Sequence, residues 1–199
     1  YQAHASKIFD HGPLSREVKL IDGTTMSMPD TVANQRAYPQ VSQQKAGLGF
    51  PIARLVGIIS LGCGAITEWM VGPCEGKQSG ETSMLWRMGA GLGWGDIVLA
   101  DRYYAGYFML ARLLAQGVDV VTRQHQLRHT DFRRGVRLGK CDHIVLWSRP
   151  KCPAWMDEAT YAAMPETLRL RECRVGGWIL VSSLCDAELV SKQDLYDLY

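Results

Sequence analysis

The stretch KLIDGTTMSMPD, residues 19–30, places an aspartate where a short aliphatic run gives way to a glycine and two threonines. The run EVKLID predicts a β-strand that ends at Asp22, because its aliphatic residues are bounded by a glycine turn at Gly23. Burying an unpaired carboxylate is costly in free energy. We therefore expect Asp22 to meet a cation, a hydrogen-bond donor or water at the end of this strand.

A second short aliphatic run, GDIVLAD at residues 95–101, also ends in an acid, Asp101. The carboxyl ends of neighbouring strands in an α/β sheet lie at one edge, where sites tend to form. Asp22 and Asp101 could then share a Mg²⁺ ion, which takes one or two carboxylates plus substrate phosphate, and a third carboxylate would allow a two-metal site. Alternatively, each aspartate caps a turn or the next helix. Spacing alone leaves both interpretations open.

The composition is typical of a globular protein with one domain or one domain and an insertion. The chain has 199 residues, of which 47% are hydrophobic and 21% charged, and a net charge of +2, which does not by itself indicate a nucleic-acid binder. No run reaches the roughly 18 apolar residues of a membrane-spanning helix, and no signal peptide is visible. Six cysteines without a C-x-x-C pair favour reduced thiols over disulfides or zinc.

Hydrophobic patterns divide the chain into three segments. Residues 1–116 alternate strands with helices expected at 79–92 and 104–116, residues 117–186 are rich in strands, and residues 187–199 begin a helix. Gly117 is expected to end the second helix. The apolar face expected on that helix comprises Tyr104, Tyr107, Phe108, Ala111, Leu114 and Ala115.

The DGTT motif occurs in two other classes of phosphate-handling enzyme, and neither fits. Haloacid dehalogenase-like phosphatases carry a nucleophilic aspartate two residues before the Asp-Gly-Thr aspartate, where this chain has Leu20. Actin-like and sugar-kinase ATPases use Asp-x-Gly-x-Thr, whereas Gly23 directly follows Asp22 here. Both interpretations are therefore rejected.

The combination of DGTT-x-x-x-PDT, a GLGFP block and a later ADRYY resembles the IS4-type transposases, and the resemblance extends over nearly the whole chain. It implies an α/β fold: a DDE catalytic domain with a ribonuclease H-like mixed sheet flanked by helices, and a β-rich insertion, residues 117–186, after the second catalytic aspartate. It implies that Asp22 and Asp101 are the first two catalytic, metal-binding acids, with Mg²⁺ as cofactor and Mn²⁺ as an alternative. The implied activity is metal-dependent cleavage at transposon ends and attack of the freed 3′-hydroxyl on target DNA.

The same resemblance places a third acid in a Y-x-x-R-x-x-x-E pattern, with Tyr199 as its tyrosine and Tyr196 as the less favoured alternative. The glutamate would follow about seven residues past Tyr199, so we expect a fragment, cut at both ends, that binds metal weakly and does not itself join DNA. The expected partners of the full-length protein are DNA and a second copy in a homodimer, with no membrane, in the nucleoid-associated cytoplasm of a bacterium. Two alternatives remain open: an inactive DNA-binding remnant of a transposable element, and a ribonuclease H-like metal-dependent nuclease.

A basic block, TRQHQLRHTDFRRGVRLGK at residues 122–140, holds much of the excess positive charge. Such a block suits contacts to DNA phosphates, although a solvated basic hairpin is the alternative. His125 and His129 are expected to belong to this surface. Trp147, Trp155 and Trp178 are expected in the core rather than stacked on bases. The predicted DNA-binding residues are Arg102, Arg123, Arg128, Arg133, Arg134, Arg137, Lys140 and Tyr199, with Arg102 and Arg123 nearest the acids.

Overall fold

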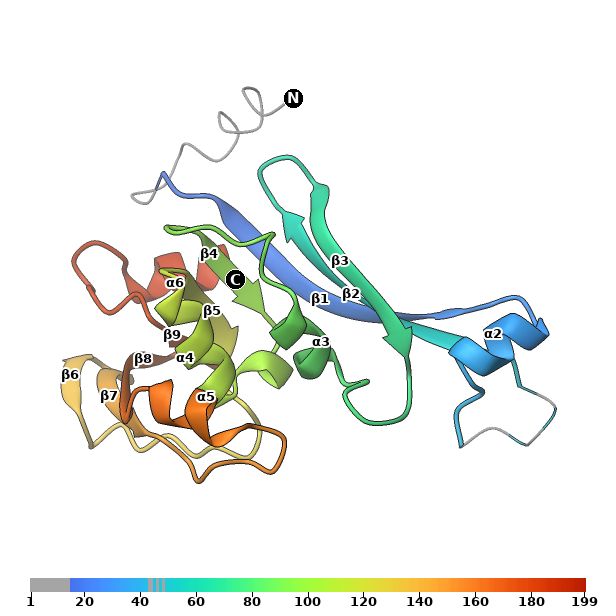
Figure 1. The fold of residues 1–199 in the computed structure, drawn as a ribbon. Helices are drawn as coiled ribbons and strands as arrows, with labels where there is room; N and C mark the ends of the chain where they lie inside the picture. The colour runs from blue at the N-terminus through green and yellow to red at the C-terminus, as the bar shows by residue number, and fades with distance from the viewer. Residues whose placement is uncertain (1–14, 43–44, 46, 48) are drawn as a thin grey trace.

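The computed structural model describes residues 15–42, 45, 47 and 49–199, so the first fourteen residues of the predicted 1–116 core lie outside the described residues. The described chain forms one mixed sheet with the strand order β3-β2-β1-β4-β5-β9-β8-β7-β6 (Figure 1). The strands are β1 (Val18–Ser27), β2 (Ile52–Ser60), β3 (Ala65–Pro73), β4 (Ile97–Ala100), β5 (Asp119–Arg123), β6 (Val136–Gly139), β7 (Asp142–Ser148), β8 (Thr167–Val175) and β9 (Trp178–Ser182).

Three parallel strands form the centre of this sheet. β4 pairs with β1 on one side and with β5 on the other, both in parallel, and the remaining pairs are antiparallel. All four residues of β4, IVLA, are buried, as expected for a parallel strand that is covered on both faces. The predicted α/β class with a mixed sheet flanked by helices is confirmed.

The expected end of the first strand is wrong. β1 does not stop at Asp22 but continues to Ser27, because β2 pairs with it along its whole length, from Lys19 opposite Ser60 to Ser27 opposite Ile52. Only the parallel pairing with β4 stops before Asp22. Gly23 is therefore a strand residue rather than a turn residue.

The helices are shorter than the sequence patterns predict. The expected helix at 79–92 is limited to α3, and the chain turns after Arg87 through a glycine-rich segment. None of the helices in the described part of the chain is long and apolar enough to cross a membrane. The helical elements are α2 (Val32–Ala37), α3 (Glu81–Arg87), the 3-10 turn η1 (Arg102–Tyr104), α4 (Tyr107–Ala115), α5 (Glu158–Ala163) and α6 (Lys192–Leu198).

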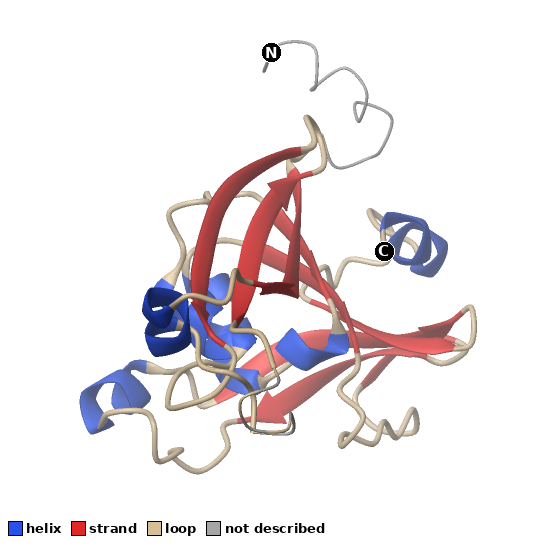
Figure 2. Ribbon diagram, turned by 90° about the vertical axis from the view of Figure 1, so that its right-hand side faces the viewer, coloured by secondary structure: helices blue, strands red, loops and turns tan. Residues whose placement is uncertain are grey.

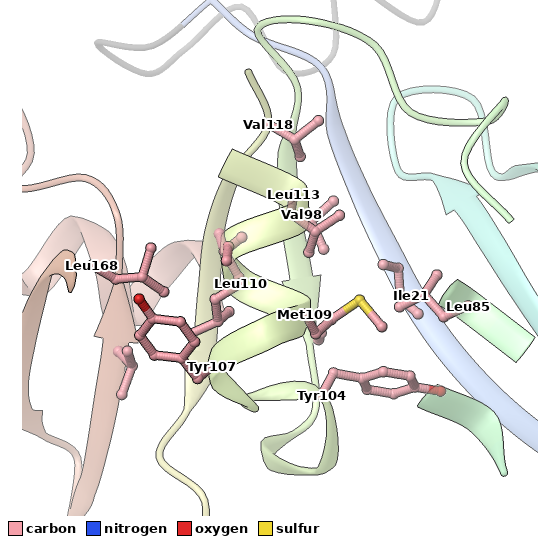
Figure 3. Packing of buried hydrophobic residues seen from close by; sticks show 14 of the residues in the cluster. Ile21, Leu85, Val98, Tyr104, Tyr107, Met109, Leu110, Leu113, Val118 and Leu168 are labelled. Carbon is pink, nitrogen blue, oxygen red and sulfur yellow. The ribbon is translucent and has the colours of Figure 1, made fainter. Parts of the chain in front are cut away.

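The helix expected at 104–116 divides into η1 and α4, and its buried face differs from the predicted stripe. Figure 3 shows that Met109, Leu110 and Leu113 of α4 lie in the core beside Tyr107. Ala115, which was predicted to be buried, is exposed. Because α4 packs against the sheet and against neighbouring elements, tertiary contacts determine which of its residues are buried. After α4, Gly117 has a positive φ of 73° as expected for a helix end.

Side chains of the sheet alternate between two cores, one on each face. The larger core lies beneath α3 and α4 and includes Ile21 and Val98. The smaller core lies beneath α6 and includes Leu99, with Leu20 packed against it. In Figure 2 the helix next to the C-terminus lies on one side of the strands, apart from the main group of helices. This alternation fixes the face to which the next residues of β1 and β4 point.

The segment 117–186 contains β5 to β9 and α5, and it extends the core sheet because β5 pairs with β4. A buried ion pair between Arg171 and Asp142 connects β7 and β8 to the residue that precedes the α6 N-cap. The Arg171 guanidinium donates two hydrogen bonds to the Asp142 carboxylate, at 2.8 and 2.6 Å, and a third to the carbonyl of Val190 at 2.6 Å. Two residues later, α6 starts with a capping box between Ser191 and Asp194.

Candidate active site

Asp22 and Asp101 occupy matching positions on adjacent parallel strands. The pairing of β1 with β4 runs to Ile21 opposite Ala100, and the two aspartates are the next residue on each strand. Asp101 keeps an extended backbone, with φ −66° and ψ 159°, and neighbouring strands lie about 4.8 Å apart. By alternation from Leu20, both carboxylates point to the α6 side of the sheet, and both are exposed.

Each aspartate uses one carboxylate oxygen in the same local way. Oδ1 of Asp22 accepts the backbone N–H of Gly23 at 2.8 Å, and Oδ1 of Asp101 accepts that of Arg102 at 2.6 Å. Asp101 thereby caps η1, as the capping alternative expects. An ionised carboxylate has about four acceptor positions, so a cap and a cation are compatible. These hydrogen bonds hold both carboxylates in fixed orientations at the same sheet edge.

Arg123 and Tyr199 lie on the same side as the two acids. Thr122 of β5 pairs with Ala100, so Arg123 is level with Asp101 on the next strand. The Arg123 guanidinium stacks 4.3 Å from the centre of the Trp178 ring, and the Tyr199 ring meets that ring edge-on at 6.1 Å. Burial and the charge of Asp101 raise the pKa of Tyr199, with Arg123 opposing them.

A third carboxylate, Glu81, lies beside this edge on the opposite face, and sequence reasoning missed it. Its carboxyl carbon is only 2.5 Å from the position that a Cβ on Gly23 would occupy. Oε2 accepts a hydrogen bond from the Tyr104 hydroxyl at 3.1 Å, and Oε1 is 4.0 Å from Nε of Arg54. The glycine after Asp22 was the available signal, since a side chain there would displace Glu81.

Negative charge at this edge contributes to a raised pKa of the Tyr104 hydroxyl. Burial raises its pKa far above the usual value, and the charge and hydrogen bond of Glu81 raise it further, with smaller contributions from Asp22 and Asp101. Figure 3 shows the Tyr104 ring extending from η1, the turn before α4, toward β1. Three carboxylates therefore act on one buried phenol, and a cation at the edge would relieve their mutual repulsion.

The raised pKa of Tyr104 predicts a loss of stability in alkali. The unfolded phenol ionises near pH 10, whereas the folded phenol keeps its proton to higher pH, so its stabilising contribution is complete below about pH 10 and falls above it. We expect the urea midpoint to fall between pH 9 and pH 11 more steeply for the natural chain than for Tyr104→Phe. Equal slopes for the two proteins would contradict the assignment.

The predicted basic residues fall into separate groups. Arg128 is partly buried, with its guanidinium 3.5 Å from the centre of the Trp147 ring, and burial lowers its pKa. Arg133 and Arg134 both pair with Asp131, at 2.8 and 3.5 Å. The last two residues, Arg137 and Lys140, are exposed at the β6–β7 hairpin.

The strand order separates this hairpin from the acids. β6 lies five strands from β4, which is on the order of 24 Å at a spacing of about 4.8 Å per strand. The predicted DNA-binding residues therefore do not form one surface. Arg102, Arg123 and Tyr199 lie near the acids, whereas Arg137 and Lys140 lie at the far edge of the sheet.

The tryptophan and histidine expectations are met only in part. Trp147 is buried in the core with 2% exposure, but Trp155 and Trp178 are exposed at 60% and 41%, so the core prediction is wrong for these two. They lie in a loop and at a strand start, where aromatic and arginine side chains contact their rings but leave part of each ring exposed. His129 is exposed and His125 is half-buried. Across the described residues, no group of three or more His, Cys, Asp or Glu side chains is arranged to hold a metal ion.

Comparison with known proteins adds no family assignment, because no protein-family model and no curated protein matches this sequence.

Proposed function

We propose that this chain is a catalytic-domain fragment of an IS4-type DDE transposase with a ribonuclease H-like core. Its reaction would be metal-dependent cleavage at transposon ends followed by 3′-hydroxyl strand transfer into target DNA. The observation that carries this proposal is the matching register of Asp22 and Asp101 on adjacent parallel strands, with both carboxylates on one face. Capping alone would not require two aspartates side by side.

The two aspartates fit a Mg²⁺ ion, or Mn²⁺ in its place. Mg²⁺ in phosphoryl-transfer sites is held by one or two carboxylates, with water and substrate phosphate as its other ligands, and Asp22 and Asp101 offer oxygen ligands from neighbouring strands. The bound cation would neutralise charge on the phosphate and lower the pKa of attacking water. The glutamate expected past Tyr199 would complete the set of acids.

The protein's own residues supply positioning around this pair. Hydrogen bonds from the following backbone N–H groups orient Asp22 and Asp101. Arg102 and Arg123 flank Asp101 and are suited to neutralise the phosphates of a strand that passes the acids. The distant β6–β7 hairpin, with Arg137 and Lys140, suits a second, sequence-independent DNA contact. In the full-length protein we propose a homodimer that acts on paired ends in the bacterial cytoplasm.

Two other functions use the same geometry. A nuclease with this core would cleave DNA but would not join a 3′ end to a target. An inactive DNA-binding remnant would bind DNA without either step. An assay with a pre-cut 3′ end and a plasmid target separates the three, because joined product, cleavage alone and binding alone are distinct outcomes.

Metal binding provides a direct test with this chain. We expect weak Mn²⁺ binding, measured by electron paramagnetic resonance of the free ion, and a loss of at least about tenfold in affinity for Asp22→Asn or Asp101→Asn, because each substitution removes a charged oxygen ligand. The matched control is Asp30→Asn, at an exposed aspartate in the loop after β1. Unchanged Mn²⁺ affinity in both site variants would count against the proposed function.

A further inference from the structure

A cavity of about 320 Å³ opens beside Asp101 at the carboxyl ends of β4 and β5. It is bounded by Arg54 of β2 and Glu81 of α3 on one side, and by the residues that directly follow β4 and β5 on the other. Its lining consists of Arg54, Glu81, Asp101, Arg102, Tyr103, His125 and Gln126. Apart from the two carboxylates, every one of these side chains can donate a hydrogen bond.

Two of the donors are available to a ligand. Arg102 is exposed, and within the described residues its guanidinium has no hydrogen bond or ion pair. His125 accepts the backbone N–H of Leu127 at Nδ1, at 3.2 Å. In the neutral ring the proton is therefore on Nε2, which remains free to donate. The cavity thus presents a guanidinium and an imidazole N–H donor from two neighbouring strand ends.

One of the two carboxylates in the lining, Glu81, already has partners. Glu81 faces Nε of Arg54 at 4.0 Å and accepts the Tyr104 hydroxyl. Arg54 itself donates from Nη1 to the carbonyl of Ser79 at 3.0 Å, and its Nε atom is buried without a hydrogen bond in the described part of the chain. Asp101 lines the cavity at the edge where a metal cation is proposed. A ligand would therefore meet Arg102, His125 and the exposed part of the Arg54 side chain, whose Nε atom stays buried.

We propose that this cavity is a phosphate subsite that holds the sugar-phosphate backbone of a DNA strand next to Asp101. The inference rests on the proposed function and deepens it, since it adds Arg54 and His125 to the DNA-contacting residues and directs the strand across the carboxyl ends of β4 and β5. A guanidinium, an imidazole N–H, the Tyr103 hydroxyl and an amide are donors suited to phosphate oxygens.

The test is binding of thymidine 3′,5′-bisphosphate to the chain in EDTA, measured by heteronuclear NMR of the arginine and histidine side chains. We expect shifts at Arg102 and His125, and about tenfold weaker binding for Arg102→Gln and for His125→Gln, since each loses a contact to an ionised phosphate. Arg169→Gln, at an exposed position on β8 to which no DNA contact is assigned, should bind as the natural chain does. Thymidine without phosphates should not bind.

The variants were chosen because Arg102 is exposed and His125 only half-buried, so neither substitution removes core packing. The subsite is refuted if the natural chain does not bind the bisphosphate, if both site variants bind it unchanged, or if Arg169→Gln loses as much affinity as they do. Since EDTA removes metal, this result is independent of Mn²⁺ binding by Asp22 and Asp101. A failed metal test with intact bisphosphate binding would reject the proposed function, and the reverse pattern would reject only the subsite.

Discussion

Asp22→Asn and Asp101→Asn should each lower the rate of DNA strand joining by about a thousandfold or more, because metal-assisted phosphoryl transfer depends on the charge of the ligands that hold the cation. Asparagine keeps the size of the side chain and its ability to accept the neighbouring N–H, so the change isolates the negative charge. The measurement is the joining of a pre-cut 3′ end to plasmid DNA in Mg²⁺, by a protein that includes the glutamate expected about seven residues past Tyr199.

The control for this experiment is Asp30→Asn, which changes the net charge equally at an exposed position away from the acid pair. We expect it to join DNA at the natural rate. Both site variants should also unfold at or slightly above the natural temperature, because Asp22 and Asp101 are exposed and lie side by side, so removing one charge relieves repulsion. Retention of most joining activity in either variant would exclude that aspartate as a metal ligand.

Asp142→Ala is expected to have the largest effect on stability, about 3–5 kcal/mol in the free energy of unfolding, because it leaves the Arg171 guanidinium buried without its counter-ion. Arg171 is 1% exposed, and its two hydrogen bonds to Asp142 link β7 to β8. Burial opposes the charged guanidinium, yet the hydrogen bonds and charge of Asp142 raise the pKa of Arg171. Urea unfolding at neutral pH measures the change.

The matched control is Asp131→Asn in an exposed aspartate–arginine pair, Asp131 with Arg133. Water already solvates that pair, so the urea midpoint should hardly move. A second consequence distinguishes the buried pair from simple loss of packing. Arg171 also donates to the carbonyl of Val190, just before α6, so Asp142→Ala should increase amide exchange in α6 before the rest of the sheet. Uniform exchange throughout the chain would argue against this link.

Local chemistry determined much of the framework in advance. β4 is recognisable as a fully buried aliphatic run that ends at Asp101, and Gly117 as the end of the following helix. The final helix was expected within residues 187–199, and it begins at Lys192, after the Ser191–Asp194 capping box. These features depend on hydrogen bonds and turns within a few residues, and hydrophobic periodicity reports them directly. The two acids were found in the same way, as strand-end aspartates.

Contacts between segments that are far apart in the sequence could not be predicted from local patterns. The continuation of β1 past Asp22 depends on β2, which supplies hydrogen bonds along the whole strand. The approach of Glu81 to Gly23 depends on how α3 packs over the sheet. The basic block also looked continuous in the sequence, but its residues end up either beside Asp101 or at the far edge of the sheet. Each outcome is a consequence of strand order rather than of local propensity.

By itself, then, the sequence indicated most of the elements and drew attention to the two aspartates, because short-range patterns encode burial and turns. The tertiary structure alone decided that Asp22 and Asp101 are level with each other, on the same face, with Arg123 one strand away. Register between strands separated by many residues is set by long-range pairing and by which side chains each face can bury. Because a shift of one residue would turn one carboxylate to the opposite face, the site exists only through that pairing.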